Sequence, residues 1–223
     1  MNQKNHGQEG YLSLTGADLD YFFFKNYTHV VGIDEVGRGP LAGPVVSCAL
    51  VFKKNHGLEN LNDSKKLSLK QRLTLLPQIL KNTLFLGVGM AFPQEIDHFN
   101  IYQATILSMK RALSHVKIPS GVLLIDGLSF SYPNFKSIKL IKGDQKSPSI
   151  MGAAIIAKII RDRLMEYYHT LYPQYGFDKH KGYGTAFHLE ALKKHGSCPL
   201  HRKSFSPIKE QVGFVACKEK PLF

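Results

Sequence analysis

Cysteine is scarce in this sequence. Its 223 residues include three cysteines, Cys48, Cys198 and Cys217, and none of them forms a CxxC pair. An odd count without such a pair argues against a disulfide framework and is typical of a reducing cytosol. No apolar run approaches the ~18 residues that a membrane span needs, and the opening MNQKNHGQEG lacks the basic-then-apolar order of a signal peptide. We therefore expect a cytoplasmic protein that does not associate with membranes.

Acidic residues are also in short supply. The chain has 29 Lys+Arg against 17 Asp+Glu, a formal net charge of +12. Residues 1–112 carry 12 basic and 9 acidic residues, and residues 113–223 carry 17 and 8, so the second half holds most of the excess. This excess favours a polyanionic partner such as nucleic acid, although a basic, merely soluble surface would look the same. The 43% of hydrophobic residues excludes disorder as the main state.

Strand and helix patterns alternate along the chain. Strands are predicted at 28–34, 45–52, 83–92, 121–126 and 135–143. Helices are predicted at 68–80, 101–116, 149–171 and 186–195, the second beginning after Asn100. The pattern indicates an α/β fold with a central mixed five-stranded sheet flanked by helices and a C-terminal helical segment. The first two strands should be antiparallel, whereas the helix between the third and fourth predicts a parallel pair joined by a right-handed crossover.

Carboxylates follow several of these strands. Asp34 and Glu35 end the first, Asp126 ends the fourth, and Asp144 follows the fifth. Ligands gather at strand ends in α/β sheets, and carboxylates that meet there repel one another unless a divalent cation intervenes. Mg²⁺ or Mn²⁺ prefers such oxygen ligands, and two such ions can support phosphodiester hydrolysis. A single Asp after a strand is more often a turn former.

The adjacency of Asp34 and Glu35 raises a geometric difficulty. Consecutive residues of a regular strand face opposite sides. For both to reach one metal site, Glu35 should already be leaving the strand, and the glycines at 37 and 39 permit this.

A glycine loop, GRGPLAG at 37–43, follows the first acids. It is one residue off a dinucleotide fingerprint and lacks the GK[ST] of a phosphate loop. Asp34 and Glu35 would also repel a pyrophosphate, so we exclude a nucleotide-cofactor site. The glycines would let a phosphate or sugar approach the backbone closely, or they form a tight turn without a ligand.

Basic residues cluster in two further segments. DSKKLSLKQR at 63–72 places Ser64 and Lys65 near a helix N-terminus, where phosphate binds readily. DKHKGYGT at 178–185 places Lys181 beside Tyr183, an aromatic residue that can stack on a sugar or base. Either segment could instead be a solvated charged run. The His and Cys residues that follow match no closed zinc-ligand spacing.

Together these motifs resemble a known family. GIDEVGRGPLAGPVV (32–46) is similar to the opening motif of bacterial ribonuclease HII, of the type 2 RNase H family. Further matches follow in family order: DSKKLS, EIDHFNIYQAT, LIDG, KGDQKSPSI, AKIIRDR, YPQYGFDKHKGYGT and HRKSF. The resemblance covers residues 28–208, leaving an N-terminal extension at 1–27 and a C-terminal tail at 209–223.

The resemblance implies an RNase H-like fold and a cytoplasmic, monomeric endonuclease. Such an enzyme hydrolyses the RNA strand of RNA–DNA hybrids and incises DNA at embedded ribonucleotides, as in ribonucleotide excision repair. It uses Mn²⁺ or Mg²⁺, with two ions in the substrate complex, and leaves 5′-phosphate ends. The alternative is a non-catalytic hybrid-binding module, which would need the lysines but not the acids.

Residue by residue, the resemblance assigns the metal-binding and catalytic carboxylates to Asp34, Glu35, Asp126 and Asp144. It matches Gly37, Arg38 and Gly39 to the loop that reads the ribose-to-deoxyribose junction, and Tyr183 to the tyrosine that stacks on the deoxyribose. With Ser64, Lys65 and Lys181, these form the expected substrate-binding set. Asp162, within AKIIRDR, is interpreted as a structural ion pair.

Overall fold

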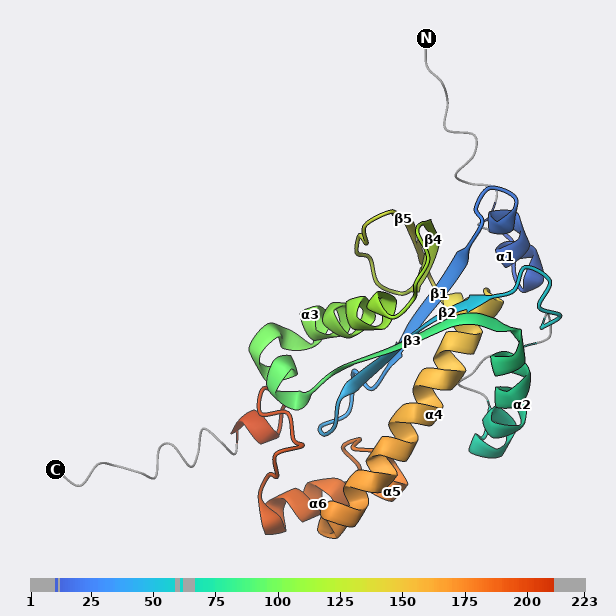
Figure 1. The fold of residues 1–223 in the computed structure, drawn as a ribbon. Coiled ribbons are helices and arrows are strands. Elements are labelled where there is room, and N and C mark those ends of the chain that lie inside the picture. Colours follow the sequence, from blue (N-terminus) through green and yellow to red (C-terminus); the bar gives the residue numbers. More distant parts are fainter. Residues whose placement is uncertain (1–10, 12, 59–60, 62–66, 211–223) are drawn as a thin grey trace.

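The computed structural model describes residues 11, 13–58, 61 and 67–210. Its centre is a five-stranded sheet with the order β3-β2-β1-β4-β5 (Figure 1). The strands are β1 (Val30–Val36), β2 (Val45–Phe52), β3 (Thr83–Ala91), β4 (Gly121–Asp126) and β5 (Phe135–Leu140). The first three pair antiparallel, whereas β4 runs parallel to both β1 and β5. This confirms the mixed sheet and the antiparallel first pair.

The predicted pairing of the third and fourth strands is wrong. β3 and β4 are separated by β2 and β1, and β4 pairs with β1, so that Ile33 lies opposite Ile125. Hydrophobic periodicity identifies a strand but not its neighbour in the sheet. The observed pairing matters because the next residues, Asp34 and Asp126, then come from adjacent parallel strands at the same level.

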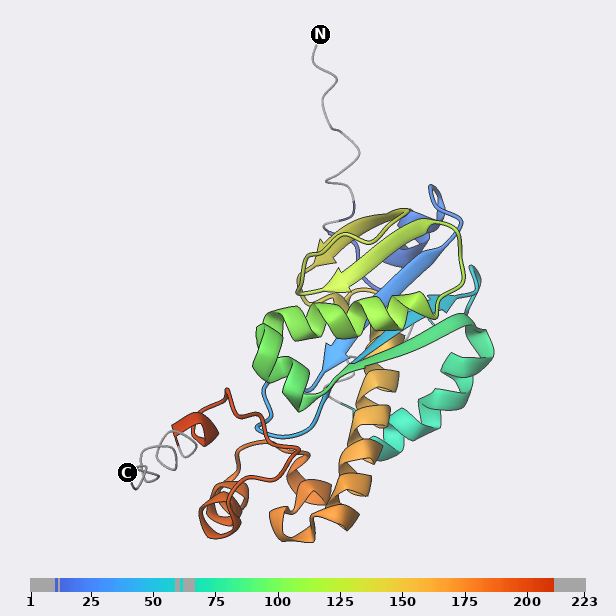
Figure 2. The ribbon, with the colours of Figure 1, turned by 60° about the vertical axis from the view of Figure 1, so that its left-hand side comes forward.

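Helices cover both faces of the sheet (Figures 1 and 2). They are α1 (Ala17–Phe24), α2 (Leu69–Asn82), α3 (Pro93–Ser114), α4 (Pro148–Leu171), α5 (Phe177–His180) and α6 (Ala186–His195), with 3₁₀ turns η1 (Gly143–Gln145) and η2 (Pro173–Tyr175). α3 lies on one face and α4 on the other, with α2 beside α4, while α5 and α6 follow the far end of α4. No helix in these ranges is both long and apolar enough to cross a membrane.

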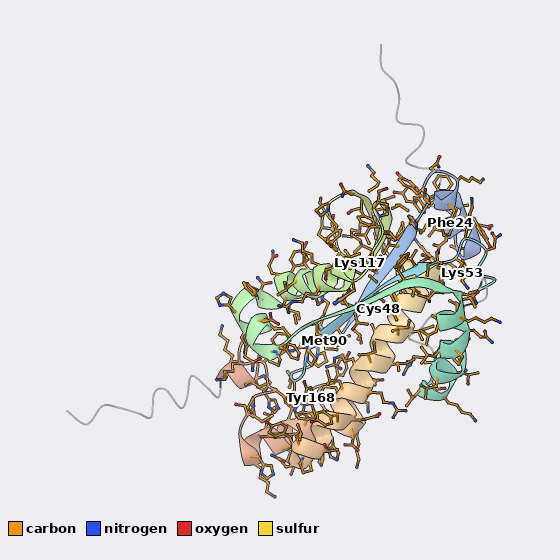
Figure 3. All side chains as sticks on the ribbon, viewed as in Figure 1. Phe24, Cys48, Lys53, Met90, Lys117 and Tyr168 are labelled. Carbon is orange, nitrogen blue, oxygen red and sulfur yellow. The ribbon has the colours of Figure 1, made fainter. Side chains whose placement is uncertain are left out.

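Successive side chains of a strand point to opposite faces of the sheet, and an apolar core lies on each face. On one face, Ile33 and Val51 pack with Met109 of α3. On the other, Cys48 and Leu50 pack with α4, and Cys48 is labelled in Figure 3. Because both faces are covered, β2 is buried along its whole length.

The start of α4 lies directly on β1. Gly32 permits this approach, because a Cβ there would lie 2.2 Å from the backbone carbon of Ser149. Ser147 caps the helix by accepting the N–H of Ile150. The helix is therefore fixed close to the strand that carries Asp34.

One helix begins earlier than predicted, and another was not predicted. The helix predicted at 68–80 is α2, which Ser68 caps in a reciprocal capping box with Gln71. α3, however, begins at Pro93, and Asn100 lies at a kink inside it with φ 67°. The Oδ1 of Asn100 still accepts the N–H of Tyr102, so it caps the second half of a longer, bent helix. No helix was predicted between 171 and 186, where α5 forms one helical turn.

The N-terminal segment packs on the sheet. Leu19 and Phe23 of α1 are buried against Val30 of β1 and Val122 of β4. The division of the chain at 27/28 and 208/209 stays a prediction.

Candidate active site

Three of the four predicted acids meet at the end of the sheet where the parallel strands β1 and β4 finish. Carboxylate oxygens of Asp34, Asp126 and Asp144 all lie within 4.8 Å of one another. Asp34 comes from β1, Asp126 from the end of β4, and Asp144 from η1, which follows β5. Asp34 and Asp144 are buried and Asp126 is half-buried. Residues up to 110 positions apart thus form one acidic cluster.

The turn that carries Asp144 is attached to the end of β4. The Oδ1 of Asp126 accepts the N–H of Gly143 at 2.6 Å. The carbonyl of Gly143 in turn accepts the N–H groups of Lys146 and Ser147, at 3.0 and 2.9 Å. One carboxylate of the cluster therefore fixes the turn that presents another.

Glu35 borders this cluster from within the strand. β1 continues to Val36, and Glu35 is paired with Ser47 of β2, so the expectation that Glu35 leaves the strand is wrong. Its Oε1 accepts Nη1 of Arg38 at 3.3 Å. Its Oε2 is buried and has no hydrogen-bond partner among the described residues. The side chain lines the same cavity as Asp34 without joining the group of three aspartates.

Burial and like charge both act on these acids. Burial raises the pKa of Asp34 well above its usual range, and the charges of Glu35, Asp126 and Asp144 raise it further. Burial also raises the pKa of Glu35, where Arg38 lowers it and Asp126 adds to the rise. A site of this kind resists full ionisation until a cation compensates the charge.

The donor set fits a hard divalent ion. It consists of carboxylate oxygens alone, as Mg²⁺ and Mn²⁺ prefer. A bound cation would lower the raised pKa of Asp34 and would give the unpartnered Oε2 of Glu35 a partner. Asp34, Asp126 and Asp144, with Glu35 beside them, are therefore the residues that could hold metal.

A cavity of about 330 Å³ opens beside the acids. Asp34 and Glu35 line one part of it, and Arg72, Lys158 and Tyr183 line another. Two larger hollows, of about 730 and 740 Å³, lie away from the three aspartates, between β3 and α3 and between α1 and β5. Of these three, the smaller cavity is the one that Asp34 and Glu35 line.

Asp162 pairs with two of the residues that line this cavity. Its Oδ1 accepts Nζ of Lys158 at 2.6 Å, and its Oδ2 lies 3.7 Å from Nη2 of Arg72. Asp162 is thus ion-paired, as interpreted from the sequence, with Lys158 and Arg72 as its partners. Lys158 stands one helical turn before Asp162, a spacing that the sequence already contained.

Two buried arginines hold the glycine loop, and the sequence analysis missed both. Arg202 donates to the carbonyls of Gly37, Arg38 and Gly43, at 2.8 Å for Arg38. Arg161 donates to the carbonyls of Pro44 and Ala42 on the same loop and to that of Lys181. Burial lowers the pKa of Arg161 to about 10 and that of Arg202 to about 9, so both stay charged at neutral pH. Both belong to segments already noted, AKIIRDR and HRKSF, but charged residues are usually placed at the surface.

These contacts set the direction of the loop amides. In a planar trans peptide the C=O and the N–H point in opposite directions. Because the carbonyls of Gly37 and Arg38 face Arg202, the N–H groups of Arg38 and Gly39 point away from it. The loop thus has a fixed donor side.

The two glycines of this loop have different roles. Gly37 has φ +95°, and a Cβ there would lie 2.1 Å from Nε of Arg161. At Gly39 a Cβ would meet only the ring of Tyr183, at 3.7 Å. Gly37 is therefore required by the fold of the loop, whereas Gly39 leaves open space beside Tyr183.

Tyr183 is presented to the cavity while Lys181 is engaged elsewhere. The side chain of Tyr183 is 45% exposed, which argues against an ordinary packed tyrosine. Nζ of Lys181 donates to Oε1 of Glu166 at 3.0 Å and to the carbonyl of Asp178. If Lys181 contacts a phosphate as predicted, its ammonium has to bind the phosphate and Glu166 at the same time. Ser64 and Lys65 lie outside the described residues.

Comparison with known proteins gives a consistent result. The family model described as Ribonuclease HII matches residues 31–208. The chain is 48% identical over 189 residues to ribonuclease HII of Vibrio campbellii, covering 85% of this chain and 89% of that protein. It is 50% identical over 188 residues to ribonuclease HII of Enterococcus faecalis, covering 84% and 73%. The crystal structure of ribonuclease H2 from Pyrococcus horikoshii superposes with a TM-score of 0.70 at 26% identity, covering 82% of this chain and 96% of that one. The last result confirms the predicted fold class.

Proposed function

This chain belongs to the ribonuclease HII family, and from that premise we propose how its own residues act. The protein is an endonuclease that hydrolyses the RNA strand of RNA–DNA hybrids. The observation that carries the mechanism is the meeting of Asp34, Asp126 and Asp144 beside the glycine loop. We propose that the same site also incises duplex DNA at single embedded ribonucleotides.

Asp34, Asp126 and Asp144 would hold divalent ions, with Glu35 as a further ligand. We propose two ions in the substrate complex, of Mg²⁺ or Mn²⁺, because four carboxylates in one site exceed the charge of one ion. Bound divalent ions supply the charge that favours an attacking water and a departing oxygen in phosphodiester hydrolysis. The protein contributes the rigid placement of the acids, through β1, the end of β4 and the turn at Gly143.

The bond that breaks joins phosphorus to the 3′ oxygen. Water adds to the phosphorus, and the 3′ oxygen leaves and takes up a proton, so one fragment ends in a 3′-hydroxyl. The other fragment keeps the phosphate at its 5′ end. Atoms and charge balance without an oxidant or a second substrate.

Recognition of ribose would rest on the glycine loop and Tyr183. The amides of Arg38 and Gly39 face away from Arg202 and could bond a 2′-hydroxyl, the group that distinguishes RNA from DNA. The exposed ring of Tyr183, beside Gly39, offers a flat face for the neighbouring deoxyribose. Together they would select a ribose followed by a deoxyribose.

Phosphate contacts would come from the basic residues. The net charge of +12 favours a polyanion, and we propose that Ser64, Lys65 and Lys181 contact the backbone of the hybrid. Binding should therefore weaken as salt is added. We also propose that the enzyme acts as a cytoplasmic monomer; its free cysteines Cys48 and Cys198 suit a reducing compartment.

A non-catalytic hybrid-binding module is the less favoured alternative. Burying like-charged aspartates is unfavourable, and a module that only binds polyanions would gain nothing from an acidic cluster. That cluster would weaken phosphate binding unless metal neutralised it.

The test uses three labelled duplexes: an RNA–DNA hybrid, a DNA duplex with one ribonucleotide, and an all-DNA duplex. Each is incubated with the protein in Mg²⁺, in Mn²⁺ and in EDTA. We expect cleavage of the first two, only with metal, and 5′-phosphate products. Binding of the hybrid without cleavage in any metal would support the binding module instead.

A further inference from the structure

Asp20 is a fully buried carboxylate outside the proposed active site. It lies on α1, in the segment that the family resemblance leaves out. Its Oδ1 accepts the hydroxyl of Ser147 at 2.6 Å, and its Oδ2 accepts both the N–H and the hydroxyl of Ser149, at 2.9 and 2.6 Å. These partners follow it by 127 and 129 residues along the chain. The three bonds join the N-terminal segment to the start of α4.

The start of α4 is a favourable place for this carboxylate. Ser147 is the N-cap of the 24-residue helix, and Ser149 lies in its first turn. The first amides of a helix lack intrahelical partners, and the positive end of the helix dipole attracts an anion. Asp20 therefore caps α4 from a different element. The backbone of β1 at Gly32 also contacts this first turn, at Ser149 and Ile150.

Ser147 connects this cap to the acidic cluster. Its hydroxyl donates to Asp20, and its N–H donates to the carbonyl of Gly143 at 2.9 Å. The N–H of Gly143 in turn bonds Asp126, and the next residue is Asp144. A continuous path of hydrogen bonds thus runs from Asp20 to the turn that presents Asp144.

Packing alone does not require a carboxylate here. α1 already contributes Leu19, Phe23 and Phe24 to the core, and Phe24 is labelled in Figure 3. A buried charge costs free energy unless it is fully hydrogen-bonded. Once it is bonded in this way, the positions of its partners are fixed by the hydrogen-bond geometry. The apolar residues are enough to attach α1, so we assign Asp20 the role of fixing the position of the start of α4.

We propose that Asp20 is a positioning residue: through Ser147 and Ser149 it fixes the turn that places Asp144 against Asp34 and Asp126. The N-terminal segment is then part of the catalytic unit and sets its affinity for divalent metal. This inference rests on the proposed function, in which these aspartates hold the metal.

The test compares Asp20→Asn with Asp18→Asn, an exposed position on the same helix. Asn keeps the size of Asp20 but removes the charge and directs an amide donor toward the Ser147 or Ser149 donors. Ser149→Ala is a milder second variant, because it removes one hydroxyl and keeps the backbone bond. For each protein, hybrid cleavage is measured against Mn²⁺ concentration, and the rise in Tm with Mn²⁺ is measured without substrate.

For Asp20→Asn we expect the half-maximal Mn²⁺ concentration to rise about tenfold, as for residues that orient metal ligands. The Mn²⁺-dependent rise in Tm should shrink in parallel. Ser149→Ala should shift both measurements less, in the same direction, and Asp18→Asn should match the wild type.

A lower Tm for Asp20→Asn with unchanged Mn²⁺ dependence would overturn the proposal and leave Asp20 a structural anchor. If Asp20→Asn does not fold, Ser149→Ala decides, and unchanged Mn²⁺ dependence there overturns the proposal. Failure of the proposed function is distinguishable, because the wild type itself would then show no metal-dependent cleavage.

Discussion

The Nε2 atoms of His188 and His201 lie 3.0 Å apart, buried in the C-terminal helical segment. The N–H of Cys198 donates to Nδ1 of His201 at 2.9 Å, so the proton of His201 is on Nε2 and is donated to His188. Nδ1 of His188 then donates to the carbonyl of Tyr183 at 2.9 Å. Both rings are neutral and fully bonded, which leaves them no nitrogen for zinc, and they fix the backbone at Tyr183.

This pair predicts a loss of stability in mild acid. Burial lowers the pKa of both His188 and His201 to about 4, against about 6.5 in an unfolded chain. Between these values the unfolded chain binds protons that the folded protein excludes, so unfolding becomes easier as the pH falls from 6.5 toward 4. Each histidine contributes at most about 1.4 kcal/mol per pH unit in this window.

The measurement is urea denaturation at several pH values between 5 and 7. Asp34 and Glu35 have raised pKa values and give the opposite slope, so variants must be compared. His188→Gln should be less stable at pH 7 but show a smaller pH dependence, while His195→Gln, at an exposed site of α6, should follow the wild type. An unchanged slope in His188→Gln would mean that this histidine titrates normally.

Asp126→Asn should separate binding from catalysis. The variant keeps an oxygen that can accept the N–H of Gly143, so the turn carrying Asp144 should stay in place. It loses the charge that attracts metal, and we expect cleavage to fall by about 10³-fold while hybrid affinity stays the same or rises. Cleavage rate and gel-shift affinity in Mg²⁺ check this, with Asp18→Asn as the control. Normal cleavage would remove Asp126 from the catalytic set.

Alanine at the two loop glycines should have contrasting effects. Gly37→Ala meets Arg161 and a left-handed backbone, so we expect a loss of roughly 1–3 kcal/mol in unfolding free energy. Gly39→Ala meets only open space and Tyr183, so its Tm should be unchanged. If Gly39 borders the substrate, its alanine variant should still lower hybrid cleavage. Full activity of Gly39→Ala would place the substrate elsewhere.

Local pattern was sufficient to predict much of this fold. The bounds of β2 and α6 agree with the prediction because a short apolar run and helix caps are encoded within a few residues. The acids at strand ends were also readable, since parallel strands bring such ends together. The positions of β3 and β4 in the sheet could not be predicted, because the neighbour of a strand depends on contacts between segments that are distant in the sequence.

The buried charges were the main omission. Asp20 lies in the extension to which the sequence assigned no role, and Arg161 and Arg202 lie in motifs without a predicted role of their own, yet all three are buried. Their partners are mostly backbone groups, which every sequence has at every position, so no residue pattern marks the contact. Glu35 shows the same limit, because the point at which a strand ends depends on its pairing with Ser47.

Tyr183 gives the sharpest test of junction recognition. Its ring is 45% exposed and its backbone is held by His180 and His188, so Tyr183→Ala should leave the Tm nearly unchanged. If the ring stacks on the deoxyribose beside a single ribonucleotide, the variant should incise that substrate about tenfold more slowly, the scale of one aromatic stacking contact. Cleavage inside a long hybrid, where each ribose is followed by another, should fall less. Phe187→Ala is the control, because Phe187 is another exposed aromatic residue of this segment but does not line the acidic cavity. Equal losses on both substrates, or a large fall in Tm, would assign Tyr183 to packing rather than to recognition.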